Sequence, residues 1–500
     1  MPALRMHRVT VGYDGREPVL RDVELHLPTG WTGVVGANGA GKTTLLRVAI
    51  GALPPAAGHV VREPLDATVR ACAQRVDEPG DDVVALAGAV DRDALRWQHR
   101  LALEPSQLAR WPTLSSGERK RWQIAAALAA APDVLVLDEP TNHLDAASRA
   151  LVLGALRRHR GVGLVVSHDR DLLDELTTTT VRIRGGEVHV HAGGYTRARA
   201  AWTEEAEARH QARVEAHRER RAATRRLGDA RRTAAAAEQQ TSRSARMKGP
   251  RDADGRSLER TGRAARAAAS AEQAVARRRR ALDEVAARVE ALAEAKERGG
   301  DVHVDWAPSP RRWLAALDGV ALRAGDVVLA PEVRVAVARD ARVHVAGANG
   351  AGKSTLLAAL VAAAELPAER LLWLPQEVSA ADGAALVATV ARLPAAERGR
   401  LGQTAALLGL DPSRALASSS PSPGEVRKLA IALGLARQAW LVVLDEPTNH
   451  LDLPAIERLE DALRRYPGAL LLASHDARFA AALTTSTWQV GGGEVIVATR

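Results

Sequence analysis

The sequence predicts an α/β protein in which two similar domains flank an α-helical hairpin. A glycine-rich segment of eight residues occurs at 36–43 and again at 347–354, each time after an apolar run and before a helix-forming run. A second motif, four apolar residues followed by Asp-Glu, also occurs once in each half. The residues between the two halves are rich in Ala, Arg and Glu, as expected for long exposed helices. The chain therefore contains a duplicated domain with an inserted helical segment.

The repeated motifs are separated by a nearly constant distance. Asp138 and Asp445 lie 307 residues apart, and Gly36 and Gly347 lie 311 residues apart. Duplication of a whole domain, followed by a small change in loop length, produces this pattern. The predicted domain boundaries are 1–196, 197–300 and 301–500.

The composition excludes several classes of protein. Of the 500 residues 46% are apolar and 26% are charged, which is typical of a globular chain. No apolar run approaches the roughly 18 residues that a membrane span requires, and no apolar signal segment follows Met1. The single cysteine, Cys72, excludes an internal disulfide and argues against a cysteine-ligated metal; we expect it to be buried. We therefore expect a cytoplasmic protein.

The glycine-rich segment Gly36–Thr43 fits the phosphate-binding loop, or P-loop, G-x-x-x-x-G-K-[ST]. In such a loop successive backbone N–H groups wrap the phosphates, and the N-terminus of the following helix adds positive potential. Lys42 is expected to reach the β and γ oxygens of ATP, and the Thr43 hydroxyl to bind Mg²⁺. The predicted nucleotide-binding residues are Gly36, Asn38, Gly39, Gly41, Lys42, Thr43 and Thr44, with Gly347, Asn349, Gly350, Gly352, Lys353, Ser354 and Thr355 in the second copy.

Two carboxylates follow each predicted central strand. Asp138 and Glu139 end the run Val134–Leu137, and Asp445 and Glu446 repeat the arrangement. We expect the aspartates to hold Mg²⁺, directly or through water, and the glutamates to orient and deprotonate the attacking water.

The segment Leu114–Glu118 resembles the signature motif of the ATP-binding-cassette ATPases. Its Gly117 lies 21 residues before Asp138, and Gly424 lies 21 residues before Asp445. The resemblance implies that Gln74 and Gln376 are Q-loop glutamines, which also contact Mg²⁺, and that His168 and His475 are switch histidines.

In that superfamily two cassettes pair head to tail, so that each ATP lies between one P-loop and the other signature. The resemblance implies that the first P-loop faces Ser422 and Gly424, whereas the second faces Ser115 and Gly117. Two features depart from the pattern. Pro421 and Pro423 alter the second signature, and Ser116 replaces a glycine in the first. Tyr13 resembles the aromatic residue that stacks on adenine, whereas Arg323–Gly325 offers no ring in the second copy.

The middle segment carries the positive charge of the chain. The net charge is +9, and residues 197–300 alone hold +10. We predict helices over about 197–240 and 257–298, each roughly 60 Å long, joined by a turn at Gly249-Pro250. The basic residues of the tip, 241–266, are Arg243, Arg246, Lys248, Arg251, Arg256, Arg260, Arg263 and Arg266.

Two cassettes joined by a charged helical hairpin, with Asn-His-Leu-Asp after both acidic strands, resemble the ABC-F family. That resemblance implies an ATP hydrolase that binds the ribosome through the 241–266 tip, which would contact large-subunit rRNA and P-site tRNA. It also implies a monomer with no transmembrane partner. The Ser-Pro-Gly-Glu motif and the Ala/Arg-rich composition resemble actinobacterial antibiotic-resistance members that protect ribosomes. A housekeeping translation factor, the ATPase pair of a membrane transporter, and a DNA-repair or chromosome ATPase remain alternatives.

Overall fold

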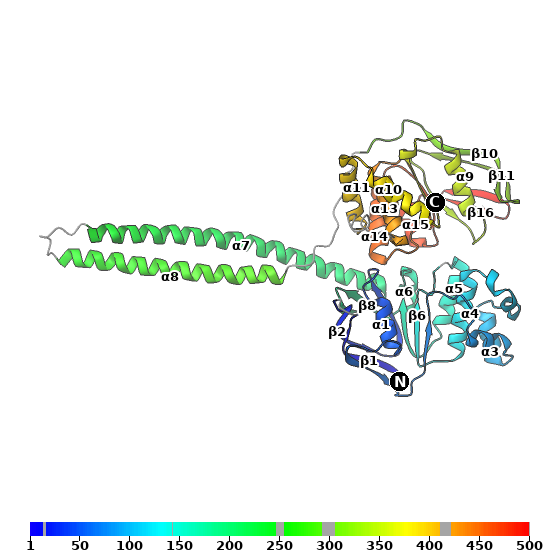
Figure 1. Ribbon diagram of the computed structural model, residues 1–500, viewed down its shortest axis with the longest axis horizontal. Helices are drawn as coiled ribbons and strands as arrows, with labels where there is room; N and C mark the ends of the chain where they lie inside the picture. Colours follow the sequence, from blue (N-terminus) through cyan, green and yellow to red (C-terminus); the bar gives the residue numbers. More distant parts are fainter. Residues whose placement is uncertain (14–16, 143, 247–254, 293–305, 411–421, 500) are drawn as a thin grey trace. The chain divides into compact units, whose positions relative to one another are not determined.

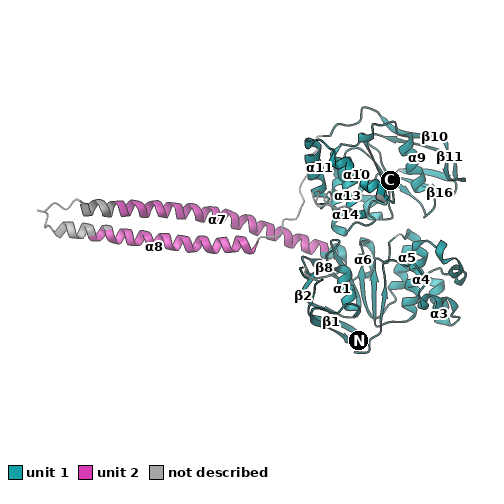
Figure 2. Ribbon diagram, viewed as in Figure 1, with its two compact units in different colours: residues 1–198, 298–500 teal, residues 199–297 magenta. Residues whose placement is uncertain are grey.

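Two α/β domains each contain a six-stranded sheet, and the two sheets have the same strand order. Figure 1 shows both domains. The computed structural model describes residues 1–13, 17–142, 144–246, 255–292, 306–410 and 422–499. The chain divides into two compact units, one formed by Met1–Ala198 with Arg298–Arg500 and the other by Arg199–Glu297 (Figure 2). The first unit holds both α/β domains, and the second holds most of the helical hairpin.

The first domain combines a six-stranded sheet with a three-stranded antiparallel sheet. The large sheet has the order β5-β6-β7-β3-β8-β9, and all neighbours are parallel except the final pair. The small sheet has the order β2-β1-β4. The strands are β1 (Ala3–Val11), β2 (Leu20–Leu27), β3 (Gly30–Gly36), β4 (Ala57–Glu63), β5 (Val69–Cys72), β6 (Val134–Asp138), β7 (Val162–Val166), β8 (Thr179–Arg184) and β9 (Glu187–Ala192).

Helices pack on the large sheet and follow several of its strands. Because a parallel sheet is covered on both faces, its central strands are continuous apolar runs, and all five residues of β7 are buried. Cys72, at the end of β5, is buried as expected. The helices are α1 (Lys42–Ala49), α2 (Asp81–Gly88), α3 (Arg92–Arg100), η1 (Pro105–Thr113), α4 (Ser116–Ala129), α5 (Ala146–Leu156) and α6 (Arg170–Leu176).

The second domain has the equivalent sheet, β13-β14-β15-β12-β16-β17, beside the antiparallel pair β10-β11. Its strands are β10 (Trp313–Ala324), β11 (Val327–Ala338), β12 (Arg342–Ala346), β13 (Leu371–Leu374), β14 (Leu441–Asp445), β15 (Ala469–Ala473), β16 (Ser486–Gly491) and β17 (Glu494–Thr499). Its helices are α9 (Lys353–Ala363), η2 (Ala368–Arg370), α10 (Ala380–Ala391), α11 (Ala395–Leu407), α13 (Pro423–Ala436), α14 (Leu453–Arg465) and α15 (Ala477–Leu483). The common strand order confirms the predicted fold class.

One pair of neighbouring residues distinguishes the two large sheets. In the first domain Trp31 on β3 lies opposite Gly163 on β7, and its indole N–H donates to the Leu156 carbonyl at 3.1 Å. In the second domain Arg342 on β12 lies opposite Leu470 on β15. The glycine is required by the ring, since a Cβ at position 163 would lie 2.4 Å from Trp31 Cδ2. At this position of the sheet, a tryptophan lies opposite a glycine in the first domain, whereas an arginine lies opposite a leucine in the second.

The hairpin consists of α7 (Tyr195–Arg246) and α8 (Gly255–Ala291). The first helix continues six residues past the predicted end at residue 240, because Thr241–Arg246 contains no helix-breaking residue. The helices are antiparallel neighbours, joined by an ion pair of Arg288 with Glu219 at 2.5 Å. Lys248 and Arg251 lie outside the described residues. No described helix is both long and apolar enough to cross a membrane.

Candidate functional site

The first P-loop lies where β3 meets α1. Gly41 is the N-terminal cap of α1 and has a left-handed backbone with φ 103°. A side chain there would also meet Val19, since a Cβ would lie 2.8 Å from Val19 Cγ1. Lys42 Nζ donates to the carbonyls of Gly36 and Ala37, at 2.8 and 3.1 Å. These two bonds hold the Lys42 ammonium against the backbone of the loop.

A cavity of about 410 Å³ opens at this loop. Residues that were predicted from separate sequence motifs all line this cavity. Its described lining residues belong to the first domain, and none comes from the second. The predicted residues among them are Tyr13, Asn38, Gly39, Gly41, Lys42, Thr43, Thr44, Gln74, Asp138, Glu139 and His168.

Two acidic side chains at the end of β6 face the P-loop. Thr43 Oγ1 donates to Asp138 Oδ2 at 3.1 Å. Glu139 is buried and accepts a hydrogen bond from the His168 backbone N–H at 3.1 Å. The same glutamate lies 3.1 Å from His168 Nε2. Parallel strands place these residues together because β6 and β7 end at the same edge of the sheet.

Burial controls the charge of these groups. It raises the pKa of Glu139 to about 8, although the His168 backbone N–H and the Lys42 ammonium both favour the carboxylate. Burial and Lys42 lower the pKa of His168 to about 3. His168 is therefore neutral at physiological pH, so its contact with Glu139 is not an ion pair.

The second domain repeats this geometry with one difference. Lys353 Nζ donates to the Gly347 and Ala348 carbonyls at 2.9 and 3.0 Å, and the His475 N–H donates to Glu446 at 3.2 Å. Burial raises the pKa of Glu446 to about 7. His475 Nε2 lies 2.9 Å from Asn349 Oδ1 and 3.5 Å from Glu446 Oε1, whereas His168 Nε2 lies 3.1 Å from Glu139 Oε1.

The remaining predicted residues of the second copy occupy equivalent positions. Gly347, Asn349 and Gly350 follow β12, Gly352 caps α9, and Lys353, Ser354 and Thr355 begin α9; Gln376 follows β13, Asp445 ends β14 and His475 follows β15.

Each predicted signature begins a helix. Ser115 caps α4, and Glu118 accepts from the Ser115 backbone N–H at 2.8 Å. Ser422 and Glu425 form the same capping box at α13. The sequence signal S-x-x-E, present in both copies, would have identified these caps. Pro421 lies outside the described residues, and Gly117 and Gly424 lie in the first turns of their helices.

The first P-loop contacts the second domain through residues that sequence reasoning missed. The Asn38 backbone N–H donates to Asp452 Oδ2 at 2.7 Å, and its side-chain amide donates to the His450 carbonyl at 3.2 Å. Both acceptors belong to the Asn-His-Leu-Asp motif. The described contacts thus bring this motif to the first P-loop, and they do not include Ser422 or Gly424.

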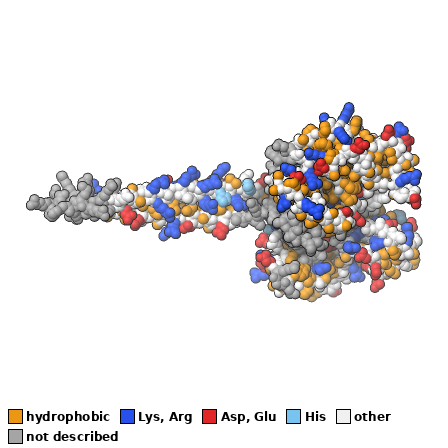
Figure 3. Space-filling view, turned by 45° about the horizontal axis from the view of Figure 1, so that its top comes forward, with side chains coloured by type: hydrophobic (Ala, Val, Ile, Leu, Met, Phe, Trp, Pro, Cys, Tyr) orange, Lys and Arg blue, Asp and Glu red, His pale blue; other side chains and the backbone are white. Residues whose placement is uncertain are grey.

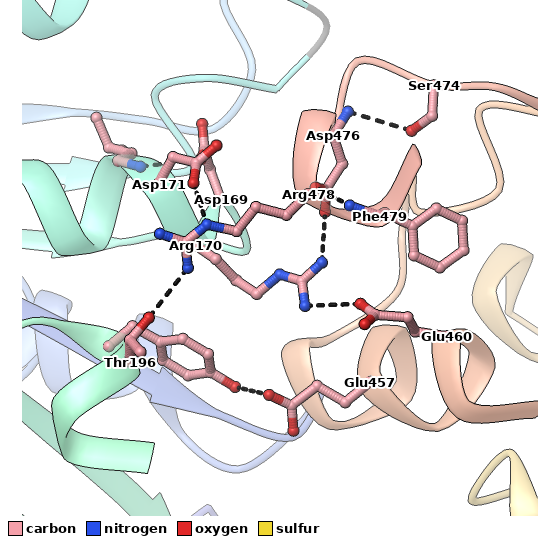
Figure 4. Close-up of polar contacts among 12 residues, drawn as sticks. Asp169, Arg170, Asp171, Thr196, Glu457, Glu460, Ser474, Asp476, Arg478 and Phe479 are labelled. Carbon is pink, nitrogen blue, oxygen red and sulfur yellow. Dashed lines mark hydrogen bonds and ion pairs between the residues drawn. The ribbon is translucent and has the colours of Figure 1, made fainter. Parts of the chain in front are cut away.

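A second set of polar contacts joins the domains at α6, α14 and α15 (Figure 4). Arg170 donates to Glu460 at 2.8 Å and to Asp476 at 3.4 Å. Arg478 pairs with Asp171 and, at 2.8 Å, with Asp174. Each domain therefore supplies one arginine to acidic residues of the other.

Comparisons with known proteins agree with this architecture. The ABC transporter family model matches residues 20–142 and 331–449. The tylosin resistance ATP-binding protein TlrC of Streptomyces fradiae is 31% identical, covering 98% of each chain. The ribosome protection protein VmlR of Bacillus subtilis is 25% identical, over 91% of this chain and 80% of its own.

A solved structure shares the fold. The archaeal ribosome recycling factor aABCE1, solved with the stalk protein aP1, superposes with a TM-score of 0.62 at 18% identity, covering 98% of this chain and 90% of that chain. The fold and the paired P-loops thus define a tandem ATP-binding-cassette ATPase. More narrowly, the chain belongs to the ABC-F family.

Proposed function

We propose that this protein binds the ribosome through the hairpin tip, residues 241–266, and protects it from an antibiotic. ATP binding and hydrolysis would drive binding and release. The observation that carries this proposal is the similarity to the tylosin resistance protein over 98% of both chains, hairpin included. The similarity to VmlR, a ribosome protection protein, supports the same class of partner. A ribosomal partner would place the protein in the cytoplasm.

The charge of the hairpin supports an RNA partner. Residues 197–300 hold +10, whereas the remainder of the chain is close to neutral. Figure 3 shows basic side chains along the described part of the hairpin, where Arg225, Arg226 and the run Arg277–Arg280 are exposed. Arginine recognises phosphate groups through two parallel hydrogen bonds. We infer that large-subunit rRNA, or tRNA in the P site, is the surface contacted.

At each P-loop we assign one glutamate as the general base. Glu139 and Glu446 would orient the attacking water and accept its proton, and raised pKa values suit this role near neutral pH. Neutral His168, held beside Glu139, would orient the same water. Lys42 and Lys353 would exchange their loop carbonyls for phosphate oxygens when ATP binds.

The residues present fit a magnesium ion. Asp445 Oδ2 is buried and has no hydrogen-bond partner among the described residues, which leaves an oxygen ligand available beside Ser354. Thr43 with Asp138, and Ser354 with Asp445, would hold the ion, together with Gln74 and Gln376. Bound there, Mg²⁺ neutralises phosphate charge.

A charge-neutralising variant of the tip tests the ribosomal partner. Replacing Arg243, Arg246, Lys248 and Arg251 with Gln should weaken ribosome co-sedimentation and flatten its salt dependence. Each phosphate contact contributes a slope of roughly −0.7 to −0.9. Basal ATPase activity should persist, because the substitutions lie outside both cassettes. Drug protection should fall together with ribosome affinity.

Identical salt titrations for the parent and the tip variant would contradict the proposal. Association with membranes instead of ribosomes would favour the transporter alternative. Ribosome binding that changes translation without protecting against any drug would favour the housekeeping role.

A further inference from the structure

A buried basic side chain occupies the same position on the helix that follows each signature serine. Arg427 on α13 and Lys120 on α4 lie 307 residues apart, and each is five residues beyond its capping serine. Arg427 is 2% exposed and Lys120 is 4% exposed. Charged side chains are rarely buried to this extent unless they are fully hydrogen-bonded. Neither residue has a place in the ATPase site described so far.

The Arg427 guanidinium joins three segments of the second cassette. One nitrogen, Nη1, donates to the backbone carbonyl of Glu446 at 3.1 Å. The other, Nη2, donates to the backbone carbonyl of Gln376. A single side chain thus ties the signature helix to the Q-loop and to the residue that follows β14.

The backbone of Glu446 is strained at the point where Arg427 binds it. Its φ is 47°, a left-handed conformation that is strained for a residue other than glycine. Its N–H donates to the Ala473 carbonyl at 2.8 Å, and its own carbonyl also accepts from Asn449 at 3.2 Å. Arg427 adds a charged donor to that carbonyl and so helps to hold the backbone from which the Glu446 carboxylate projects.

The first cassette lacks this bridge. Lys120 Nζ donates to the Ala73 carbonyl, just before Gln74, and to Gln123 Oε1 at 3.2 Å. Glu139 has the same left-handed backbone, with φ 49°, yet the described bonds of Lys120 do not reach its carbonyl. A lysine ammonium donates from one nitrogen at the end of a flexible chain, whereas an arginine guanidinium donates from separate nitrogens of a rigid planar group.

We propose that Arg427 is a positioning residue for ATP hydrolysis at the second P-loop, where its two hydrogen bonds hold the Glu446 backbone to the signature helix and to the Q-loop. The first P-loop operates without these bonds. The inference rests on the proposed role of Glu446 as general base.

The substitution Arg427→Lys tests this role, because lysine keeps the charge but replaces the two separate donor nitrogens of the guanidinium with a single one. It is measured in a Glu139→Gln background, so that hydrolysis reports the second P-loop. We expect kcat to fall about tenfold while KM for ATP stays within about twofold, since a hydrogen bond from a charged donor to the reacting residue's backbone is lost. Arg437→Lys, at the end of the same helix beside Glu397, is the control and should leave both constants unchanged.

Three results would overturn the proposal. A kcat within twofold of the background would show that the bridge is dispensable. Loss of fluorescent ATP-analogue binding or of folding, together with activity, would make Arg427 a structural residue. Hydrolysis by the Glu139→Gln/Glu446→Gln variant would instead contradict the proposed general bases, and with them the basis for Arg427; this result is distinguishable because it does not involve position 427.

Discussion

Tyr13 gives the first P-loop an aromatic surface for which the second has no sequence counterpart. Its hydroxyl lies 3.3 Å from Thr44 Oγ1, and its ring lines the cavity while remaining 45% exposed. In a Lys353→Ala background, which disables the second P-loop, Tyr13→Ala should weaken ATP-analogue binding about fivefold. This corresponds to about 1 kcal/mol for a lost stacking contact. Fluorescence titration measures the affinity.

Tyr13→Phe is the matched control, because it keeps the ring and removes only the hydroxyl. Its affinity should stay close to that of the background. If Phe and Ala weaken binding equally, the hydroxyl contact to Thr44 accounts for the effect and stacking does not.

Among the functional residues, the sequence predicted those that belong to short motifs of fixed spacing. Tyr13, Gln74 and His168 lie far apart in the chain, yet the structure places all three at one cavity. Arg427 and Asp452 escaped prediction because their roles depend on which backbone groups meet them. Local sequence does not show which backbone carbonyls a helix arginine will meet.

Strands β3 and β7 meet at a contact that admits only glycine. Because a Cβ at position 163 would lie 2.4 Å from the Trp31 ring, Gly163→Ala should shift a buried strand or an indole. We expect the first cassette to lose about 2 kcal/mol of stability through this overpacking. Thermal unfolding followed by Trp fluorescence should show a lowered midpoint.

Gly154→Ala serves as the comparison within the same cassette. Gly154 lies inside α5, and no atom comes within 4 Å of a Cβ built there. Alanine should therefore be neutral or stabilise the helix by up to about 1 kcal/mol. Equal destabilisation by both substitutions would refute the steric argument at Gly163.

Elements were predictable where composition and periodicity agreed. The apolar run 134–137 became β6, and the uninterrupted Ala/Arg/Glu run became α7. Their limits were less predictable, as the extension of α7 to Arg246 shows, because the composition changes gradually there. Short antiparallel strands such as β4 carry mixed burial and give no distinct pattern.

Each cassette contributes an arginine that pairs with acidic residues of the other, and these pairs stabilise the association of the cassettes. Arg170 is 8% exposed, and its partners Glu460 and Asp476 belong to the second cassette. Arg170→Ala would leave two carboxylates without this cation and should weaken the association by about 2 kcal/mol. Calorimetry should then resolve separate unfolding of the two cassettes at a lower temperature.

Arg157→Ala controls for the loss of an arginine. Its pair with Glu175 lies within the first cassette and both side chains are about half exposed. Such pairs contribute roughly 0–1 kcal/mol, so the calorimetric profile should be unchanged. A parental profile for Arg170→Ala would show that other contacts suffice to join the cassettes.

The duplication itself was visible in the constant motif offset, because copied domains keep their spacing. The contacts between the copies were not visible. They involve residues such as Arg170, whose equivalent in the second copy, 307 positions later, is Ala477. An internal repeat therefore predicts the motif residues that both halves contain. The interface between the halves depends on residues that are present in only one of them.

The Trp31–Gly163 pair limits which strands the two halves of the chain could exchange. The nine residues Leu137–Asp145 are identical to Leu444–Asp452, and each stretch lies between the two strands that form the pair. Unequal crossing-over at that repeated stretch would join Trp31 to Leu470, or Arg342 to Gly163. In the first hybrid the Trp31 ring and the Leu470 side chain would compete for the same space. In the second, Arg342 would lie opposite a glycine, which leaves space unfilled. Strands of the two halves therefore do not fit one another at this position, and exchanging one of them would require a compensating change in the strand beside it.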